Sequence, residues 1–360
     1  MTRRNPIVET FGLTVPLFQA PMAGAGDTPE LVSAVCNAGG LGFIGAAYLS
    51  PAEIIARSFA LKQLTSKPFG MNLFAPLPAA QVQQSEIEAA TSDLALYYRE
   101  LGVDLPSLPR PSWTFEDQLD AVLQTGASAF SFAFGTIPSD TVHRLRNSGM
   151  YVMGTATTVK EAQALQELGV DAVIAQGGEA GGHRSTFSGH FEAAMIGTLT
   201  LVPQVADAIS IPVIASGGIM DGRGVAAALV LGASAAQLGT AFLTCKESGV
   251  PRSYKSAILS ATEDSTALIR AFSGRPARGI VNRVARDYAT GEKKIVPFPI
   301  QNALTRPMRN AAAKQDNSDY LSLWAGQGLR MARECSAAEL VTSIAQETRA
   351  ALRSLTETGW

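Results

Sequence analysis

The stretch from Gln176 to Arg184 reads QGGEAGGHR and brings an amide, a carboxylate, an imidazole and a guanidinium together in nine residues. Its four glycines permit positive φ angles and a close approach of backbone to a ligand. His183 is the group best suited to proton transfer near neutral pH, and as a cation or donor it would stabilise an anionic substrate or oxyanion. We expect Glu179 and Arg184 to orient the loop. The alternative is a glycine-rich connector with solvated polar side chains.

The other histidines have no comparable setting. His143 falls on a predicted surface helix, and His190 lies in a polar loop. The sequence has no metal-ligand spacing and no G-x-S-x-G nucleophile motif. His183 is therefore the candidate catalytic residue, and no metal is expected.

Two further glycine segments follow the seventh and eighth predicted strands. They are Ser216-Gly217-Gly218 and Gly239-Thr240. In (β/α)₈ barrels the loops at this position often bind phosphate. Glycines expose backbone N–H groups, a helix start adds partial positive charge, and Thr240 offers a hydroxyl. The pattern predicts a phosphate site; the alternative is that these glycines serve only tight turns.

The group attached to this phosphate is indicated by two amides at other strand ends. Asn72 and Gln176 are expected to point into the barrel mouth, where amides recognise a flat heterocycle that donates and accepts hydrogen bonds. The backbone of Ala20, Pro21 and Met22 would pass under its face. An isoalloxazine with one ribityl phosphate fits these features, so the predicted cofactor is FMN. Either amide could instead be a satisfied structural residue.

Strands and helices alternate along the first two thirds of the chain, which predicts parallel crossover units. Eight such units predict an α/β fold of the (β/α)₈ TIM-barrel type. The competing doubly wound sheet would carry G-x-G-x-x-G after its first strand, but residues 22–27 read MAGAGD. The predicted strands are Leu17–Met22, Leu41–Ala46, Phe69–Phe74, Ala127–Phe134, Tyr151–Ala156, Asp171–Gln176, Ile211–Ser216 and Ala235–Leu238.

Three parts are predicted. Residues 1–243 form the FMN-binding barrel, residues 244–310 a small cap or substrate subdomain over its mouth, and residues 311–360 C-terminal helices that pack on the barrel. Helices are also predicted within the later parts, at Ser253–Ala261 and Ser336–Leu355.

Composition narrows the class of protein and its location. The net charge of −2 offers no basic field for nucleic acid or anionic lipid. The uncharged run from Val225 to Leu243 is long enough for a membrane span, but its polar residues and glycines divide it into a helix, a turn and a strand. Three widely spaced cysteines predict no disulfide framework and fit the cytoplasm. The oligomeric state stays open between monomer and homodimer.

Several segments together resemble the nitronate monooxygenase family, formerly called 2-nitropropane dioxygenases. Two late segments resemble its class I members in particular. The matching segments, in chain order, are QAPMAG at 19–24, SFAFG at 131–135, QGGEAGGHR at 176–184, SGGIMDGR at 216–223, QLGTAF at 237–242, PFPIQN at 297–302 and LWAGQ at 323–327.

The resemblance implies an FMN enzyme that oxidises alkyl nitronates, including propionate 3-nitronate, with O₂ to nitrite and a carbonyl product through a flavin semiquinone. It implies a role in detoxification. His183 would hold the nitronate or remove the α-proton of a neutral nitroalkane. The residues expected to bind FMN are Ala20, Pro21, Met22, Asn72, Gln176, Gly181, Gly182, Ser216, Gly217, Gly218, Gln237, Leu238, Gly239 and Thr240.

One position departs from the family pattern. Aromatic hydroxyls often line the substrate pocket in this class, but Phe298 stands in the C-terminal segment, so the substrate preference is open. Tyr288 is a candidate replacement. The rival functions are an NAD(P)H-dependent FMN reductase of the enoyl-thioester or quinone type, an FMN storage or sensor protein, and a flavin-free sugar-phosphate barrel.

Overall fold

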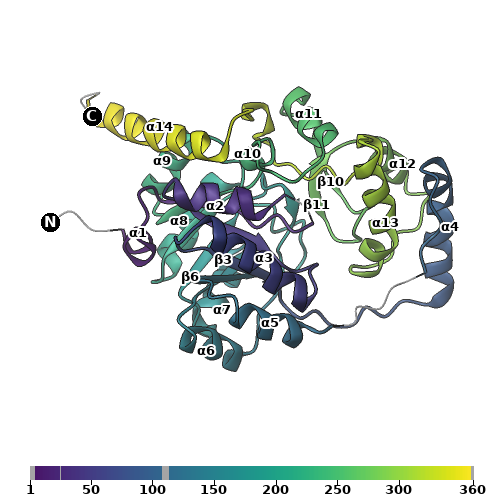
Figure 1. Ribbon diagram of the computed structural model, residues 1–360, viewed down its shortest axis with the longest axis horizontal. Coiled ribbons are helices and arrows are strands. Elements are labelled where there is room, and N and C mark those ends of the chain that lie inside the picture. The colour runs from purple at the N-terminus through teal and green to yellow at the C-terminus, as the bar shows by residue number, and fades with distance from the viewer. Residues whose placement is uncertain (1–4, 25, 108–112, 358–360) are drawn as a thin grey trace.

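A computed structural model describes residues 5–24, 26–107 and 113–357. Eight parallel strands close into a barrel in the order β1-β2-β3-β4-β5-β6-β8-β9, with β9 pairing with β1 (Figure 1). The predicted (β/α)₈ fold is confirmed. The barrel strands are β1 (Leu17–Gln19), β2 (Leu41–Gly45), β3 (Gly70–Phe74), β4 (Ala129–Ala133), β5 (Tyr151–Ala156), β6 (Ala172–Gln176), β8 (Val213–Ser216) and β9 (Ala235–Leu238).

Most of the helices around the barrel begin at a residue whose side chain caps the first turn, and α6 and α8 are the exceptions among those given below. Ser50 and Glu53 form a capping box at the start of α3, and Thr28 accepts a hydrogen bond from the backbone N–H of Leu31 in α2. The surrounding helices are α2 (Pro29–Asn37), α3 (Pro51–Leu64), α5 (Phe115–Leu123), α6 (Ser139–Asn147), α7 (Val159–Leu168), α8 (Thr198–Ala208) and α9 (Gly222–Val230).

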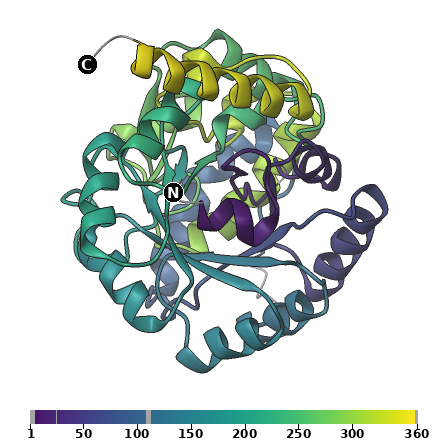
Figure 2. The ribbon, with the colours of Figure 1, turned by 90° about the vertical axis from the view of Figure 1, so that its left-hand side faces the viewer.

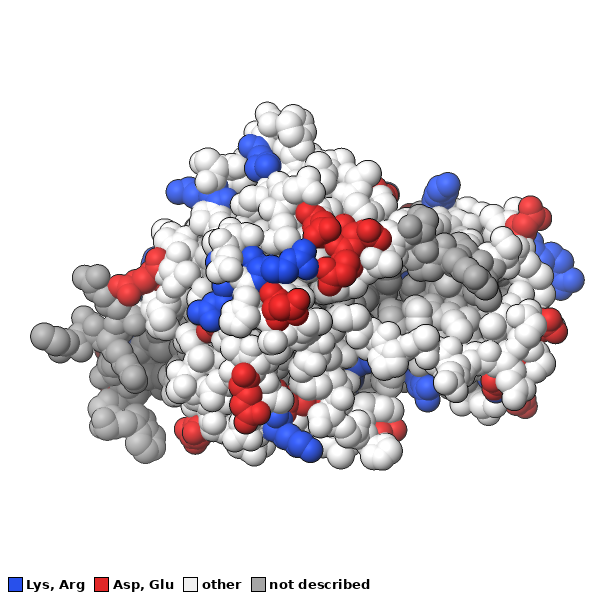
Figure 3. Space-filling view, turned by 90° about the horizontal axis from the view of Figure 1, so that it is seen from below, with Lys and Arg blue, Asp and Glu red and all other residues white. Residues whose placement is uncertain are grey.

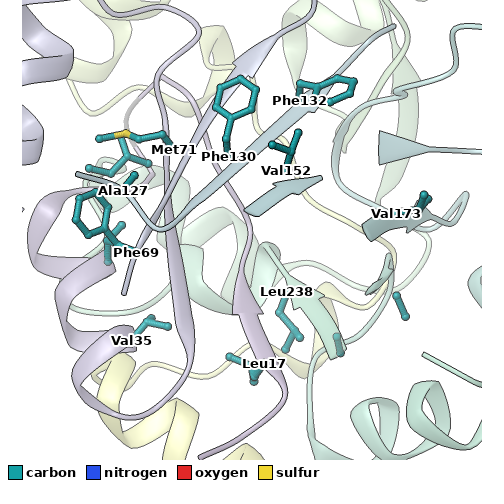
Figure 4. Packing of buried hydrophobic residues seen from close by; sticks show 14 of the residues in the cluster. Leu17, Val35, Phe69, Met71, Ala127, Phe130, Phe132, Val152, Val173 and Leu238 are labelled. Atoms are coloured by element: carbon teal, nitrogen blue, oxygen red, sulfur yellow. The ribbon is translucent and has the colours of Figure 1, made fainter. Parts of the chain in front are cut away.

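The side chains of each barrel strand alternate between two cores. Those that face the helices form the larger core, to which Met71, Phe130 and Leu238 belong (Figure 4). Those that face inward, such as Phe18 and Ile174, pack with Phe11 from α1 (Pro6–Phe11). Because α1 packs against these inward-facing side chains, one end of the barrel is filled.

A third core lies within the group of elements at the right of Figure 1, which we call the cap from here on. It includes residues from beyond 244–310 as well. The helix α4 (Gln84–Glu100), inserted after β3, packs on α13 (Ile300–Lys314), and the Tyr98 hydroxyl donates to the Leu304 carbonyl. The other elements of the cap are β10 (Thr266–Ile269), β11 (Ala277–Ile280), α11 (Arg252–Ser260) and α12 (Arg283–Ala289).

The C-terminal helix α14 (Ala337–Glu357) lies along α9 and α2 on the outside of the barrel (Figures 1 and 2). Its apolar face, including Leu340 and Ile344, joins the larger barrel core. Among the described residues, no helix has both the length and the apolar character that a membrane crossing needs. On the face in Figure 3, acidic and basic side chains lie close to one another.

Candidate active site

A cavity of about 300 Å³ lies between the strand ends and the cap. Every residue expected to bind FMN contributes to its wall except Leu238. The side chain of Leu238 is buried in the core between strands and helices, because neighbouring residues of a strand face opposite sides. His183 also lines the cavity, whereas His143 and His190 do not.

His183 lies on a short strand that belongs to a second sheet and not to the barrel. Gly182 and His183 form β7, which pairs with β11 of the cap in a three-stranded sheet of order β10-β11-β7. Gly182 has φ +75°, a conformation that residues with a Cβ rarely adopt. The imidazole is therefore positioned jointly by the barrel loop and the cap.

The rest of the loop is fixed by two buried networks. The Arg184 guanidinium is buried and donates to the carbonyls of Gln176, Gly177 and Ala194 and to Gln176 Oε1. The Glu179 carboxylate accepts from the backbone N–H and hydroxyl of Thr198, with distances of 2.9 Å. Both residues hold the loop, as expected from the sequence.

The Gln176 side chain, which the sequence assigned to ligand binding, makes most of its hydrogen bonds within the loop. Its Oε1 accepts from Arg184 and from the Ser185 backbone N–H at 3.0 Å. Its Nε2 donates to the His183 carbonyl at 3.0 Å. One amide proton is left for a ligand, because a side-chain amide has two.

The environment of the His183 ring is aromatic and cationic. Nε2 lies 2.9 Å from Ser273 Oγ, and Phe134, Phe298 and Trp324 surround the ring. Ser273 Oγ also lies 3.0 Å from the Arg275 carbonyl and donates its single proton there, so we assign Nε2 as the protonated nitrogen. Nδ1 makes no hydrogen bond within the described chain and is left as a base.

Burial lowers the pKa of His183 to about 3, and the neighbouring Arg275 and Arg309 guanidinium groups add to this shift. The ring is neutral at neutral pH. Among the described residues no carboxylate acts on the pKa of His183, so of the two expected roles, cation or donor, a neutral ring fits the donor. A neutral imidazole can accept a proton.

Asn72 and Gln237 supply acceptors that have no partner in the described chain. Asn72 Nδ2 donates to the carbonyl and the hydroxyl of Ser131, at 3.0 and 2.9 Å, so both amide protons are used and Oδ1 is left as an acceptor. Gln237 Oε1 is buried and unpaired. Two unpaired acceptors on the cavity wall fit a ligand with several N–H or O–H donors, as an isoalloxazine and a ribityl chain provide.

The glycines after β8 and β9, Gly217, Gly218 and Gly239, line the cavity. Gly217 and Gly218 have φ values of +119° and +69°. Thr240 Oγ1 accepts from the Gly326 backbone N–H at 2.9 Å, so the Thr240 hydroxyl proton is available to a ligand. These features fit a phosphate cradle.

The helix start after β8 does not contribute as the sequence suggested. The Asp221 side chain accepts from the first-turn N–H groups of Arg223 and Gly224, and Glu347 of α14 accepts from Gly222. These three N–H groups are thus unavailable to a phosphate.

Several residues on the cavity wall were not identified from the sequence. Tyr48 follows β2, and Arg306 and Arg309 lie on α13. Tyr288, the proposed replacement for an aromatic hydroxyl, lies in the core of the cap and not on the cavity. Tyr48 and Tyr254 are the tyrosines that line the cavity within the described chain. Only the Tyr48 hydroxyl lacks a partner, since that of Tyr254 donates to the Trp324 carbonyl.

Comparison with known proteins decides between the families that use this barrel. A family model described as nitronate monooxygenase matches residues 5–347. The chain belongs to the nitronate monooxygenase family. A probable nitronate monooxygenase of Bacillus subtilis is 41% identical over 345 residues, which cover 95% of this chain and 99% of that protein. One of Staphylococcus saprophyticus is 41% identical over 338 residues, covering 92% and 94%.

Solved structures agree with this family. The nitroalkane oxidase of Streptomyces ansochromogenes superposes with a TM-score of 0.89 at 41% identity, over 97% of this chain and 99% of that one. FabK from Thermotoga maritima gives a TM-score of 0.77 at 29% identity over 99% of both chains. This member of the nitronate monooxygenase family is thus an oxidoreductase that acts on a small molecule.

Proposed function

We propose that this chain is an FMN-dependent nitronate monooxygenase, which oxidises alkyl nitronates such as propionate 3-nitronate with O₂ to a carbonyl compound and nitrite. The observation that carries the proposal is the neutral His183 imidazole on a cavity whose other walls hold unpaired acceptors and glycine turns. Bound FMN supplies the electron acceptor for the nitronate and the means of reducing O₂.

The chain's own residues divide the work of binding this cofactor. Asn72 Oδ1 and Gln237 Oε1 would accept from ring or ribityl donors. Thr240 and the backbone of Gly217 and Gly218, which line the cavity, would hold the phosphate. The loop from Ala20 to Met22 would pass beside the ring system.

The unprotonated Nδ1 of His183 would accept the α-proton of a neutral nitroalkane. Phe134, Phe298 and Trp324 pack around the ring, and its burial keeps its pKa low. A nitronate already lacks this proton, so for nitronates His183 would orient the substrate. The three free cysteines suit a reducing cytoplasm.

Anaerobic mixing of the purified FMN-loaded protein tests the proposal. Propionate 3-nitronate should bleach the flavin absorbance at once, and the reduced protein should turn over when O₂ is admitted. The competing function is the NAD(P)H-dependent FMN reductase that the sequence left open. Rapid bleaching by NADH with no response to the nitronate would establish that competitor instead.

The role of His183 is tested by His183→Asn. The variant should keep its FMN while turnover with a neutral nitroalkane falls roughly tenfold or more, in line with contributions of about 10²–10⁴ from acid–base groups. Equal turnover of the variant and the wild type would remove His183 from the mechanism.

A further inference from the structure

Arg309 is a cation on the cavity wall that has no counter-ion. Nη2 donates to the carbonyl and Oδ1 of Asn302 at 3.1 and 2.7 Å, and Nη1 donates to Ser322 Oγ at 3.3 Å. Nε is buried and has no acceptor. No carboxylate of the described residues forms an ion pair with it or acts on its pKa.

The Tyr48 hydroxyl, like Arg309 Nε, is a buried donor without an acceptor. Tyr48 and Arg309 act on each other's pKa. Arg306, one turn earlier on α13, lies over the Tyr48 ring with its guanidinium carbon 5.3 Å from the centroid. This part of the cavity therefore carries positive charge and unused donors.

Burying a cation without a counter-ion lowers the free energy of unfolding. Such a residue can be retained because a ligand supplies the opposite charge. Burial lowers the pKa of Arg309 only to about 10, so the charge persists at neutral pH. One N–H and one O–H donor match the two oxygens of a carboxylate. Arg309 and His183 both line this cavity, and the Arg309 charge lowers the pKa of His183.

We propose that Arg309 and Tyr48 form a carboxylate subsite, which selects nitronates that carry a carboxylate on a short tail over nitronates with an apolar tail. The subsite rests on the proposed function, since the reacting end of the same substrate lies at His183. It makes propionate 3-nitronate a better substrate than ethyl nitronate.

The kinetic test compares these two substrates in Arg309→Gln. The kcat/KM with propionate 3-nitronate should fall roughly 10- to 100-fold, as expected for loss of a charged hydrogen bond, chiefly through KM. With ethyl nitronate the fall should be at least several times smaller. Tyr48→Phe should act in the same direction and more weakly. Equal losses with both substrates in Arg309→Gln would overturn the subsite.

Lys314→Gln is the matched control, because it removes the same charge from an exposed position of α13 outside the cavity. It should change neither substrate's kcat/KM. If it mimics Arg309→Gln, the effect comes from net charge and the subsite is wrong.

A binding measurement separates the subsite from the proposed function. Calorimetric titration of the FMN-loaded protein with propionate should give saturable binding that is lost in Arg309→Gln and kept in Lys314→Gln. This outcome supports the subsite even if no nitronate reduces the flavin, a result that would refute the proposed function alone. No propionate binding to the wild type, or equal binding to Arg309→Gln, would overturn the subsite.

Discussion

His183 pairs with Ala277 across the ladder between β7 and β11, so the imidazole stands on a strand whose partners belong to the cap. The next residue continues this contact, since the Arg184 backbone N–H donates to the Pro276 carbonyl at 2.9 Å. The loop that carries His183 thus extends from a barrel strand, and its pairing with the cap sets the position of the imidazole over the cavity.

Gly182→Ala should test how far turnover depends on this placement. Gly182 has φ +75°, and an added Cβ would meet nothing within 4 Å, so the cost is backbone strain of about 1–2 kcal/mol. We expect that loss in the free energy of unfolding, measured by urea denaturation. We also expect a roughly tenfold fall in turnover, because a small displacement of a reacting group is costly.

Gly149→Ala provides the control for Gly182→Ala. Gly149 has φ +81°, and its added Cβ would also meet nothing within 4 Å, but it lies away from the cavity. It should lose similar stability with unchanged turnover. A fall in turnover equal to that of Gly182→Ala would mean that general destabilisation, and not ring placement, accounts for both.

Thr240→Val should weaken FMN binding. The substitution removes the hydroxyl proton available to a phosphate and also leaves the Gly326 N–H without its acceptor. An unmade hydrogen bond of this kind costs about 1–3 kcal/mol, which corresponds to a roughly 5- to 150-fold higher Kd. Fluorescence titration of the FMN-free protein gives this Kd. Thr240→Ser keeps the hydroxyl and should bind nearly as the wild type; equal weakening in both variants would place the phosphate elsewhere.

The barrel and most of its mouth were predictable because the same pattern repeats along the chain: an apolar strand, a glycine-containing or polar turn, and a helix. Apolar runs ending in glycine and polar residues fixed the strand ends, and parallel strands bring those ends together. The position of helix α8 is hard to predict from the sequence, because Pro203 lies inside it and no side chain caps its start at Gly197. Leu238 was included with its neighbours, although alternation turns it into the core.

The substrate side of the cavity was not predictable in the same way. Tyr48 and Arg309 stand 261 positions apart, and neither lies in a motif whose chemistry is local. Their meeting depends on how the cap packs over the barrel. Even the neutrality of His183 depends on this packing, because Arg275, Arg309 and the aromatic ring contacts come largely from the cap.

His183→Asn should also change how stability depends on pH. The pKa of His183 is about 3 in the folded protein and 6.5 as an ordinary histidine, so between these values the unfolded chain binds more protons. The contribution of His183 to stability therefore rises with pH through this window, by up to about 1.4 kcal/mol per pH unit. In urea denaturation of the FMN-free proteins at pH 5, 6 and 7, the stability of the wild type relative to the variant should increase with pH. Parallel curves would contradict a neutral buried imidazole.

Asp27→Asn should have the opposite effect. Asp27 Oδ2 accepts from the backbone N–H groups of Met22 and Gly45 at 2.7 and 2.6 Å, which shapes the loop after β1. Burial raises the pKa of Asp27 from 3.8 to about 7, so between these values the folded protein binds more protons. Its contribution to stability is present at low pH and is lost as pH rises through 7.

Relative to Asp27→Asn, the wild type should therefore lose stability from pH 5 to pH 8, by up to about 1.4 kcal/mol per pH unit below 7, in urea denaturation of the FMN-free proteins. Asp140→Asn alters an exposed carboxylate on α6 and should run parallel to the wild type. Between pH 4 and 6.5, Asp27 and His183 change the free energy of unfolding with pH in opposite directions, so their effects partly cancel in the wild type. Each single variant removes one effect and leaves the other measurable. A variant curve parallel to that of the wild type would mean that Asp27 is ionised throughout, held by its two backbone donors and by Arg57 at 3.9 Å.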